Sequence, residues 1–237
     1  DKIKIKITNK KMDDIRFIGQ FKNNINRKNN SITKSLNTLR KYGLINKKNK
    51  YKITVEKKIP VFAGLGGGTS NAVFLVKYFL KNKINDEVLK IFEKEIGSDF
   101  RLFFQKQFFQ KNLKKILKFK KKYNFNFILI YPNIHCSSKE IYSKVNKYNV
   151  PLKNDLSKIQ YKSKYLQFLQ GETNDLQNIV EKKYYKIKKI LNLLKIQKKS
   201  LFSRMTGSGS VCFGVFPDKK SARLSLRTIK KKLPNYW

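Results

Sequence analysis

A cluster of glycines between a strand-like and a helix-like segment is the part of the sequence best suited to bind a charged ligand. Glycine stands at positions 64 and 66–68, and Thr69, Ser70 and Asn71 follow it. Backbone without Cβ atoms can curl closely around a bulky anion. Free N–H groups at the start of the next helix would face that anion, and the helix dipole would favour its charge. The spacing predicts a phosphate cradle, although an isolated glycine cluster fits a flexible hinge equally well.

Two further segments carry side chains that can do chemistry. Asp99 follows Gly97 and a helix expected over residues 87–96, where its carboxylate can either accept a proton or simply end the turn. Residues 207–210 read Gly-Ser-Gly-Ser before an apolar strand expected over 211–216, which alone predicts a turn. His135 is the only histidine of the sequence and is expected to be a loop residue and not a catalyst. Cys136 and Cys212 lack metal or redox spacing and are expected to be small buried residues.

The segments around the glycine cluster have clear periodicity. Residues 51–56 alternate between apolar and polar, which predicts a half-buried strand. Apolar residues recur at helical spacing over 72–80, and Ser70 or Asn71 is expected to cap that helix. The chain opens on Ile3, Ile5 and Ile7 alternating with lysine, a pattern typical of an edge strand.

Other elements are expected farther along the chain. Helices are predicted over 29–45, over one long stretch from 176 to 194, and after Asp218, the last with Ala222, Leu224, Leu226 and Ile229 as its apolar positions. An apolar strand is predicted over 126–131. The lysine-rich segment 105–124 is expected to be a solvated helix or a disordered insertion, with a basic binding arm less favoured.

The composition limits the classes of protein to which this chain can belong. A chain of 237 residues with 40% hydrophobic and 13% aromatic residues has enough apolar side chains for one large or two small folded domains. The formal charge of +40 raises the question of nucleic-acid binding. That function is not favoured, because the excess is mostly lysine spread along the whole chain, whereas arginine, the residue preferred for planar recognition of phosphates and bases, is scarce. No run approaches the roughly 20 apolar residues that span a bilayer.

Three motifs, in order, resemble those of the GHMP kinases. Residues 60–72 resemble the family's Pro-x-x-x-Gly-Leu-Gly-Gly-Gly-Ser-Ser-Asn-Ala loop. Residues 97–99, Gly-Ser-Asp, are similar to its Gly-Ala-Asp, although Arg101 replaces the usual proline. Residues 205–209, Met-Thr-Gly-Ser-Gly, resemble its second glycine loop. The resemblance implies an α+β fold with an N-terminal domain over 1–123, a C-terminal domain over 124–237 and an active site in the cleft between them.

The resemblance also implies roles for these residues. Asp99 would be the catalytic carboxylate, and the reaction would use ATP and Mg²⁺, with no protein ligand assigned to the metal. The residues implied in nucleotide binding are Pro60, Gly64, Leu65, Gly66, Gly67, Gly68, Thr69, Ser70 and Asn71 of the first loop and Gly207, Ser208 and Gly209 of the second.

The implied acceptor is a small cytidyl-diphosphate molecule. The chain is most similar to the GHMP kinases that phosphorylate a hydroxyl of 4-diphosphocytidyl-2-C-methyl-D-erythritol in non-mevalonate isoprenoid biosynthesis, which implies a cytoplasmic enzyme without membrane or specific nucleic-acid partners. Ser138 and Tyr142 fall on positions that help to form the cytidine pocket, although Tyr142 would fit a core position as well. A homoserine- or mevalonate-type kinase and a basic nucleic-acid-binding protein on the same fold remain alternatives, and the oligomeric state stays open.

One expectation concerns the start of the sequence. Family members begin with a strand carrying a lysine that approaches the transferring phosphate, followed by a Gly-Tyr-His segment, and neither precedes Ile3 here. Lys2, Lys4 and Lys6 are expected on the solvent side of a strand. We therefore expect the chain as written to be inactive, because electrostatic stabilisation of the phosphoryl group would lose a fixed cation.

Overall fold

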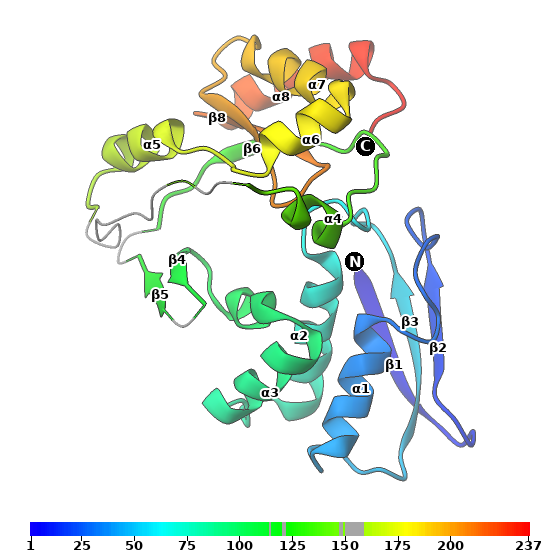
Figure 1. Cartoon of the computed structure of the whole chain (residues 1–237). Helices are drawn as coiled ribbons and strands as arrows, with labels where there is room; N and C mark the ends of the chain where they lie inside the picture. Colours follow the sequence, from blue (N-terminus) through cyan, green and yellow to red (C-terminus); the bar gives the residue numbers. More distant parts are fainter. Residues whose placement is uncertain (114, 120–121, 147–148, 150–158) are drawn as a thin grey trace. The chain divides into compact units, whose positions relative to one another are not determined.

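The computed structural model describes residues 1–113, 115–119, 122–146, 149 and 159–237. The chain forms two compact units. The first contains Asp1–Val61 and Gly66–Lys106, and the second contains Phe62–Leu65 and Gln107–Trp237 (Figure 1). The chain thus changes unit inside the glycine cluster. The functional domain boundary between residues 123 and 124 stays a prediction.

The first unit is built on a three-stranded sheet with the order β1-β3-β2. The central strand β3 (Lys50–Glu56) runs antiparallel to β1 (Lys2–Thr8) and parallel to β2 (Asp14–Ile18). The expected edge strand is therefore confirmed. Its lysines face solvent as expected and Ile3 and Ile5 pack against the core, but Ile7 is 71% exposed.

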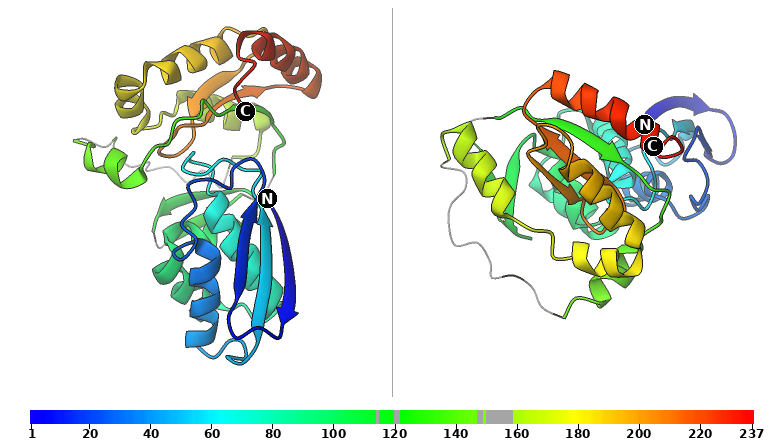
Figure 2. Two further views of the ribbon diagram at one scale, coloured as in Figure 1. Left: turned by 90° about the vertical axis from the view of Figure 1, so that its right-hand side faces the viewer. Right: turned by 90° about the horizontal axis from the view of Figure 1, so that it is seen from above.

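Three helices and a 3₁₀ helix complete the first unit: α1 (Ser31–Lys41), α2 (Gly67–Leu80), α3 (Asp86–Ile96) and η1 (Ser98–Phe104). One face of the sheet is covered by α1 and α2, as the blue and cyan segments of Figures 1 and 2 show. Fully buried Leu36, Ile53 and Leu75 join these three elements. Because α1 shares this interface with α2, both helices are fixed to the same sheet.

The start of α2 differs from the expectation. The helix begins at Gly67, and its N-cap is Gly66 in the left-handed conformation (φ 62°). Ser70 and Asn71 were expected to cap the helix, and that prediction is wrong, since both already lie in its first two turns. A left-handed N-cap is open to glycine at little steric cost, so the glycine cluster itself starts the helix.

The second unit contains an antiparallel sheet with the order β6-β8-β7. Its strands are β6 (Asn126–Ile130), β7 (Phe202–Met205) and β8 (Cys212–Phe216). Helices α7 (Tyr185–Lys195) and α8 (Lys219–Lys232) bury one face of it in a common core with buried residues of all three strands (Figure 2). The shorter helices are α4 (Ser138–Ser143), α5 (Lys162–Gly171) and α6 (Gln177–Lys183).

The helical pattern of this unit departs from the sequence prediction in two places. The long helix is two helices, because Tyr184 leaves the helical region (φ −131°, ψ 85°) between α6 and α7. In α8, Leu224 and Leu226 are exposed, and the buried face consists of Ser221, Ser225 and Ile229. Asp218 caps this helix by accepting a hydrogen bond from the Ser221 N–H at 2.7 Å.

The lysine-rich segment forms neither the expected helix nor a disordered insertion. Two antiparallel strands, β4 (Phe108–Asn112) and β5 (Lys115–Lys118), form a hairpin. The Gln107 side chain closes its base by hydrogen bonds to both the N–H and the carbonyl of Tyr123, at 2.9 and 2.6 Å. Phe119 is buried edge-on against Tyr165 of α5. Residues 114, 120 and 121 of the segment lie outside the described residues.

Across the described ranges, no helix combines the length and the apolar character that a bilayer crossing requires.

Candidate active site

The first turn of α2 carries the features of an anion site. Its initial backbone N–H groups have no partner within the helix, and the turn contains no acidic residue that would oppose an anion. Gly68 lies beside the start of α1, because a Cβ on it would be 3.7 Å from the Ser31 hydroxyl. Thr69 and Ser70 are partly exposed and offer hydroxyls next to these N–H groups. The turn therefore suits a phosphate, with the starts of two helices side by side.

Under this turn lies a group of three polar side chains, Asp1, Lys57 and Asn71, called here the buried polar cluster. The Lys57 ammonium and the Asp1 carboxylate form an ion pair in which each side chain is only 2% exposed. Asn71 is buried as well and donates from Nδ2 to the same carboxylate at 2.8 Å. Burial lowers the pKa of Lys57 to about 8, because loss of water disfavours the ammonium.

The buried polar cluster places one cation, the Lys57 ammonium, near the first turn of α2. The Lys57 Nζ would be 3.6 Å from a Cβ on Gly67. Its charge is nevertheless neutralised by Asp1 and shielded from solvent, so it cannot contact a phosphate directly. Asn71, which the sequence assigns to nucleotide binding, turns its amide nitrogen toward Asp1.

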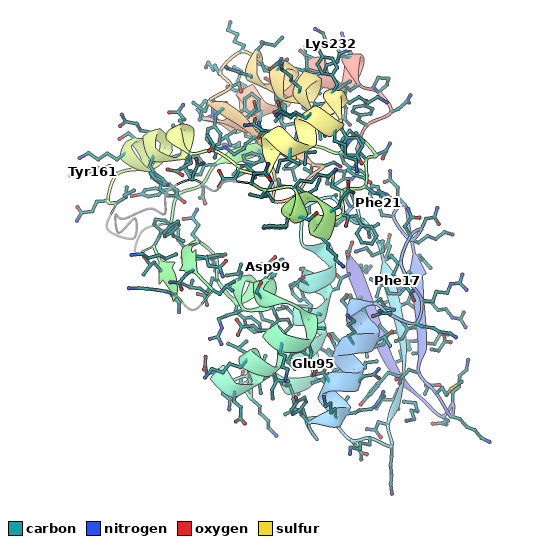
Figure 3. The ribbon with its side chains drawn as sticks, in the orientation of Figure 1. Phe17, Phe21, Glu95, Asp99, Tyr161 and Lys232 are labelled. Carbon is teal, nitrogen blue, oxygen red and sulfur yellow. The ribbon has the colours of Figure 1, made fainter. Side chains whose placement is uncertain are left out.

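Asp99 is the second residue of η1 and is exposed (Figure 3). The 3₁₀ helix packs against the start of α2, because a Cβ on Gly66 would lie 2.7 Å from the Phe103 ring. Arg101 fixes η1 from the other side by a bidentate ion pair with Glu93 of α3, at 2.8 and 3.1 Å. The first unit thus holds the element carrying Asp99 against the cradle.

The second glycine loop, residues 205–209, packs on residues 63 and 64 of the first loop, which belong to the second unit. The Ala63 carbonyl accepts a hydrogen bond from the Val211 N–H at 3.2 Å. Gly64 is left-handed (φ 74°), and a Cβ on it would overlap the Thr206 carbonyl oxygen. Glycine at 64 therefore permits close contact between the two loops inside the second unit.

The Asn174 side chain fixes the second glycine loop by hydrogen bonds. Its Nδ2 donates to the carbonyls of Met205 and Gly207, at 2.9 and 2.8 Å, while its Oδ1 accepts from the Leu176 N–H at 3.0 Å. A local Asx turn explains only the last of these bonds, since the N-cap of α6 is Leu176, whose side chain makes no capping hydrogen bond. The side chain therefore both ends the turn before α6 and fixes the loop, a role that the sequence analysis missed because side-chain donation to distant carbonyls leaves no local pattern.

A substitution separates these two roles. Aspartate accepts the hydrogen bond of an Asx turn as asparagine does, but Asn174→Asp replaces the amide donor by an acceptor facing two carbonyls. We expect it to lower the free energy of unfolding by about 1–3 kcal/mol, at least as much as Asn174→Ala. Urea denaturation followed by circular dichroism measures this. If Asn174→Asp is as stable as the wild type, the local turn before α6 is the whole role of the residue.

The residues assigned to the cytidine pocket lie in the second unit. Ser138 begins α4, and its hydroxyl lies 2.7 Å from that of Ser208 in the second glycine loop. Tyr142, also on α4, is 55% exposed, so it is available as a stacking surface instead of filling the core. His135 packs near the exposed Phe62 ring, with a centroid distance of 5.9 Å. The described structure thus joins a predicted substrate residue to a predicted nucleotide residue.

The described residues give little support to a cysteine nucleophile or to a metal site built from protein side chains. Both cysteines are buried and free, as expected, and burial raises the pKa of Cys136 to about 11 and that of Cys212 to about 12. Neither thiol is thus ionised near neutral pH, which a nucleophile requires. Within the described ranges, no three His, Cys, Asp or Glu side chains gather closely enough to hold a metal ion.

Comparison with known proteins identifies the class of this fold. The sequence matches the GHMP kinases N terminal domain over residues 30–100 and the GHMP kinases C terminal domain over residues 155–235. The structure is similar to the crystal structure of a 4-(cytidine 5'-diphospho)-2C-methyl-D-erythritol kinase, with a TM-score of 0.62 at 17% identity over 97% of this chain and 81% of the other. For a homoserine kinase from Cytophaga hutchinsonii the TM-score is 0.64 at 15% identity, over 99% and 82%. These structures show the expected α+β fold.

Two relatives are similar to this chain in sequence over most of its length. The chain is 37% identical over 243 residues to the 4-diphosphocytidyl-2-C-methyl-D-erythritol kinase of Pelagibacter ubique, covering 100% of this chain and 84% of the relative. It is 32% identical over 221 residues to the enzyme of that name from Wolbachia pipientis, covering 90% and 74%. The chain belongs to the GHMP kinase family, as its motifs indicated.

Proposed function

We propose that the protein is an ATP-dependent kinase that transfers the γ-phosphoryl group to a hydroxyl of 4-diphosphocytidyl-2-C-methyl-D-erythritol, in the cytoplasm, for isoprenoid precursor synthesis. The observation that carries this proposal is the similarity, along nearly the whole chain, to two relatives named 4-diphosphocytidyl-2-C-methyl-D-erythritol kinase, at 37% and 32% identity. The first turn of α2, whose free N–H groups suit an anion, and the exposed Asp99 on η1, which packs against that turn, support the proposal.

The nucleotide phosphates would bind at the first turn of α2. The N–H groups of Gly67 and Gly68 and the hydroxyls of Thr69 and Ser70 would donate to phosphate oxygens. Mg²⁺ bound to ATP would supply further neutralisation of the phosphate charge. With no cluster of metal ligands among the described residues, Thr69 and Ser70 are the residues in this turn that would add an oxygen ligand.

Asp99 would act on the acceptor. Its carboxylate is exposed and would accept, or orient, the proton of the hydroxyl as that hydroxyl attacks the γ-phosphorus. The contact between Phe103 and Gly66 holds η1 at the start of α2, and the Arg101–Glu93 ion pair holds it to α3. Positioning of the attacking group accounts for much of the catalysis in phosphoryl transfer.

The cytidine ring would stack on Tyr142 in the second unit. Because Tyr142 is 55% exposed, removal of its ring does not open the core. We expect Tyr142→Ala to raise KM for the cytidyl substrate by an amount equivalent to about 1–3 kcal/mol of lost stacking, and to leave KM for ATP nearly unchanged. Steady-state kinetics with each substrate varied in turn measures both. An equal effect on the two constants, or none, would remove Tyr142 from the substrate site.

A substrate panel tests the proposed function directly. ATP turnover is measured with the cytidyl substrate, homoserine and mevalonate, using the full-length protein. Turnover with the cytidyl substrate alone supports the proposal. Turnover with homoserine or with mevalonate would instead assign the protein to another branch of the family. Salt-sensitive binding to random DNA without any ATP turnover would instead favour a basic nucleic-acid-binding protein on this fold.

A further inference from the structure

The buried polar cluster connects the two ends of the first glycine loop. One oxygen of the Asp1 carboxylate accepts hydrogen bonds from the N–H groups of Lys58 and Ile59, both at 2.9 Å, just before the loop. The other oxygen accepts from the Asn71 amide at 2.8 Å, just after it, and from the Lys57 ammonium. A single carboxylate therefore ties residues 58–59 to the first turns of α2, and the glycine loop spans the interval between them.

Stability alone is a weak explanation for this arrangement. Two charges taken out of water lose much of their hydration, and well-packed apolar residues of similar volume often stabilise a fold as well or better. Hydrogen bonds to fixed partners, in contrast, specify geometry that apolar contacts leave adjustable. The Asp1 carboxylate has four such partners, and Lys57 offsets its charge, so no net negative charge lies under a turn suited to phosphate.

We infer that Asp1 and Lys57 are positioning residues for the nucleotide: through Asn71 and the 58–59 backbone they set the spacing of the glycine loop and the direction of its N–H groups. The inference rests on the proposed function, since it assumes that the first turn of α2 holds the phosphates of ATP. Neither side chain contacts the ligand, because both are 2% exposed. Their effect would therefore appear in nucleotide affinity.

The experiment separates positioning from stability with an apolar double variant. ATP affinity is measured by calorimetry, well below each Tm, for the wild type, Lys57→Met and Asp1→Leu/Lys57→Met. Lys57→Met leaves a buried carboxylate without its cation, so we expect Tm to fall by about 10 °C and affinity by about tenfold or more. The double variant recovers part of the Tm, because no buried charge is left unpaired, but its ATP affinity stays low, because leucine accepts no hydrogen bond from Lys58, Ile59 or Asn71.

Asp1→Asn gives a second test, because charge and geometry predict opposite changes in ATP affinity. It leaves Lys57 as an uncompensated cation under the cradle, which by charge alone would bind phosphate more tightly. We expect weaker ATP binding, by about tenfold, because the amide turns a donor toward Asn71 and breaks the tie. Lys58→Met is the matched control. Its side chain is 64% exposed and only its backbone contacts Asp1, so Tm and affinity should match the wild type.

Three results would count against the inference, and one against its premise. A double variant with wild-type ATP affinity would show that the buried polar cluster serves stability alone. Asp1→Asn with unchanged or tighter ATP binding, or Lys58→Met with a loss equal to that of Lys57→Met, would overturn the positioning role. A wild-type protein that binds no ATP would overturn the proposed function and this inference with it, and is recognised before any variant is measured.

Discussion

Replacement of Asp99 by asparagine is expected to lower kcat by about 10²-fold or more and to leave ATP affinity largely intact. The amide has the size of the carboxylate but cannot accept the proton of the acceptor hydroxyl. Because Asp99 is exposed on η1, the change leaves the packing of Phe100 and Phe103 in place. Steady-state turnover with the cytidyl substrate and calorimetry with ATP, both on the full-length protein, measure the two quantities.

Glu95→Gln is the matched control for this substitution. It makes the same chemical change four residues earlier, at Glu95 near the end of α3 (Figure 3). The Glu95 carboxylate pairs with Lys41 at 3.4 Å. The exposed ion pair there is worth only about 0–1 kcal/mol, so turnover should stay near that of the wild type. Turnover of Asp99→Asn near the wild-type rate would reduce Asp99 to a residue that ends the turn after Gly97.

The sequence predicted those elements whose residues carry periodicity or a cap. Alternation over residues 51–56 gave β3, and Asp218 before a run of helix formers gave the start of α8. Three ordered motifs gave the family, which the relatives confirmed. In each case neighbouring residues encode the structure, so a single sequence suffices.

Elements that depend on distant contacts were missed. Val180 and Ile187 are two helical turns apart, so the apolar stripe continues across Tyr184 and gives no sign of the break between α6 and α7. The strands of the β4–β5 hairpin carry no alternation, since they read Phe-Phe-Gln-Lys-Asn and Lys-Ile-Leu-Lys, and the hydrogen bonds that close its base join Gln107 to Tyr123, 16 residues away. The prediction of a solvated helix or a disordered insertion over 105–124 was therefore wrong for the described part of that segment.

Lys57 was missed although a signal was present. It continues the alternation of Tyr51, Ile53 and Val55, and the buried side of a strand is where that alternation places it. In a chain with 55 lysines and arginines, one more lysine attracts no attention. Its partner Asp1 lies 56 residues away in sequence, and no local rule links the two.

The largest steric effect is expected at Gly64. A methyl group there would overlap the Thr206 carbonyl oxygen and come within 2.8 Å of the Thr206 hydroxyl. The carbonyl accepts a hydrogen bond from the Gly209 N–H within the second loop, and the hydroxyl donates to the Ala63 carbonyl of the first loop. Backbone atoms cannot rotate away as a flexible side chain does. We therefore expect Gly64→Ala to push the loops apart and to lower kcat/KM for ATP by about 10²-fold, the scale associated with a displacement of about 1 Å in an active site.

Gly43→Ala distinguishes this clash from backbone strain. Gly43 is also left-handed (φ 66°), but a Cβ on it meets no atom within 4 Å among the described residues. Both substitutions therefore carry the strain of a left-handed alanine, about 1–2 kcal/mol, and only Gly64→Ala adds the contact with Thr206. Gly43→Ala should lower Tm by a few degrees and leave kcat/KM for ATP at the wild-type value. If the two variants lose kcat/KM equally, strain and not loop contact explains the effect; if neither loses it, the close approach of the two loops has no part in nucleotide binding.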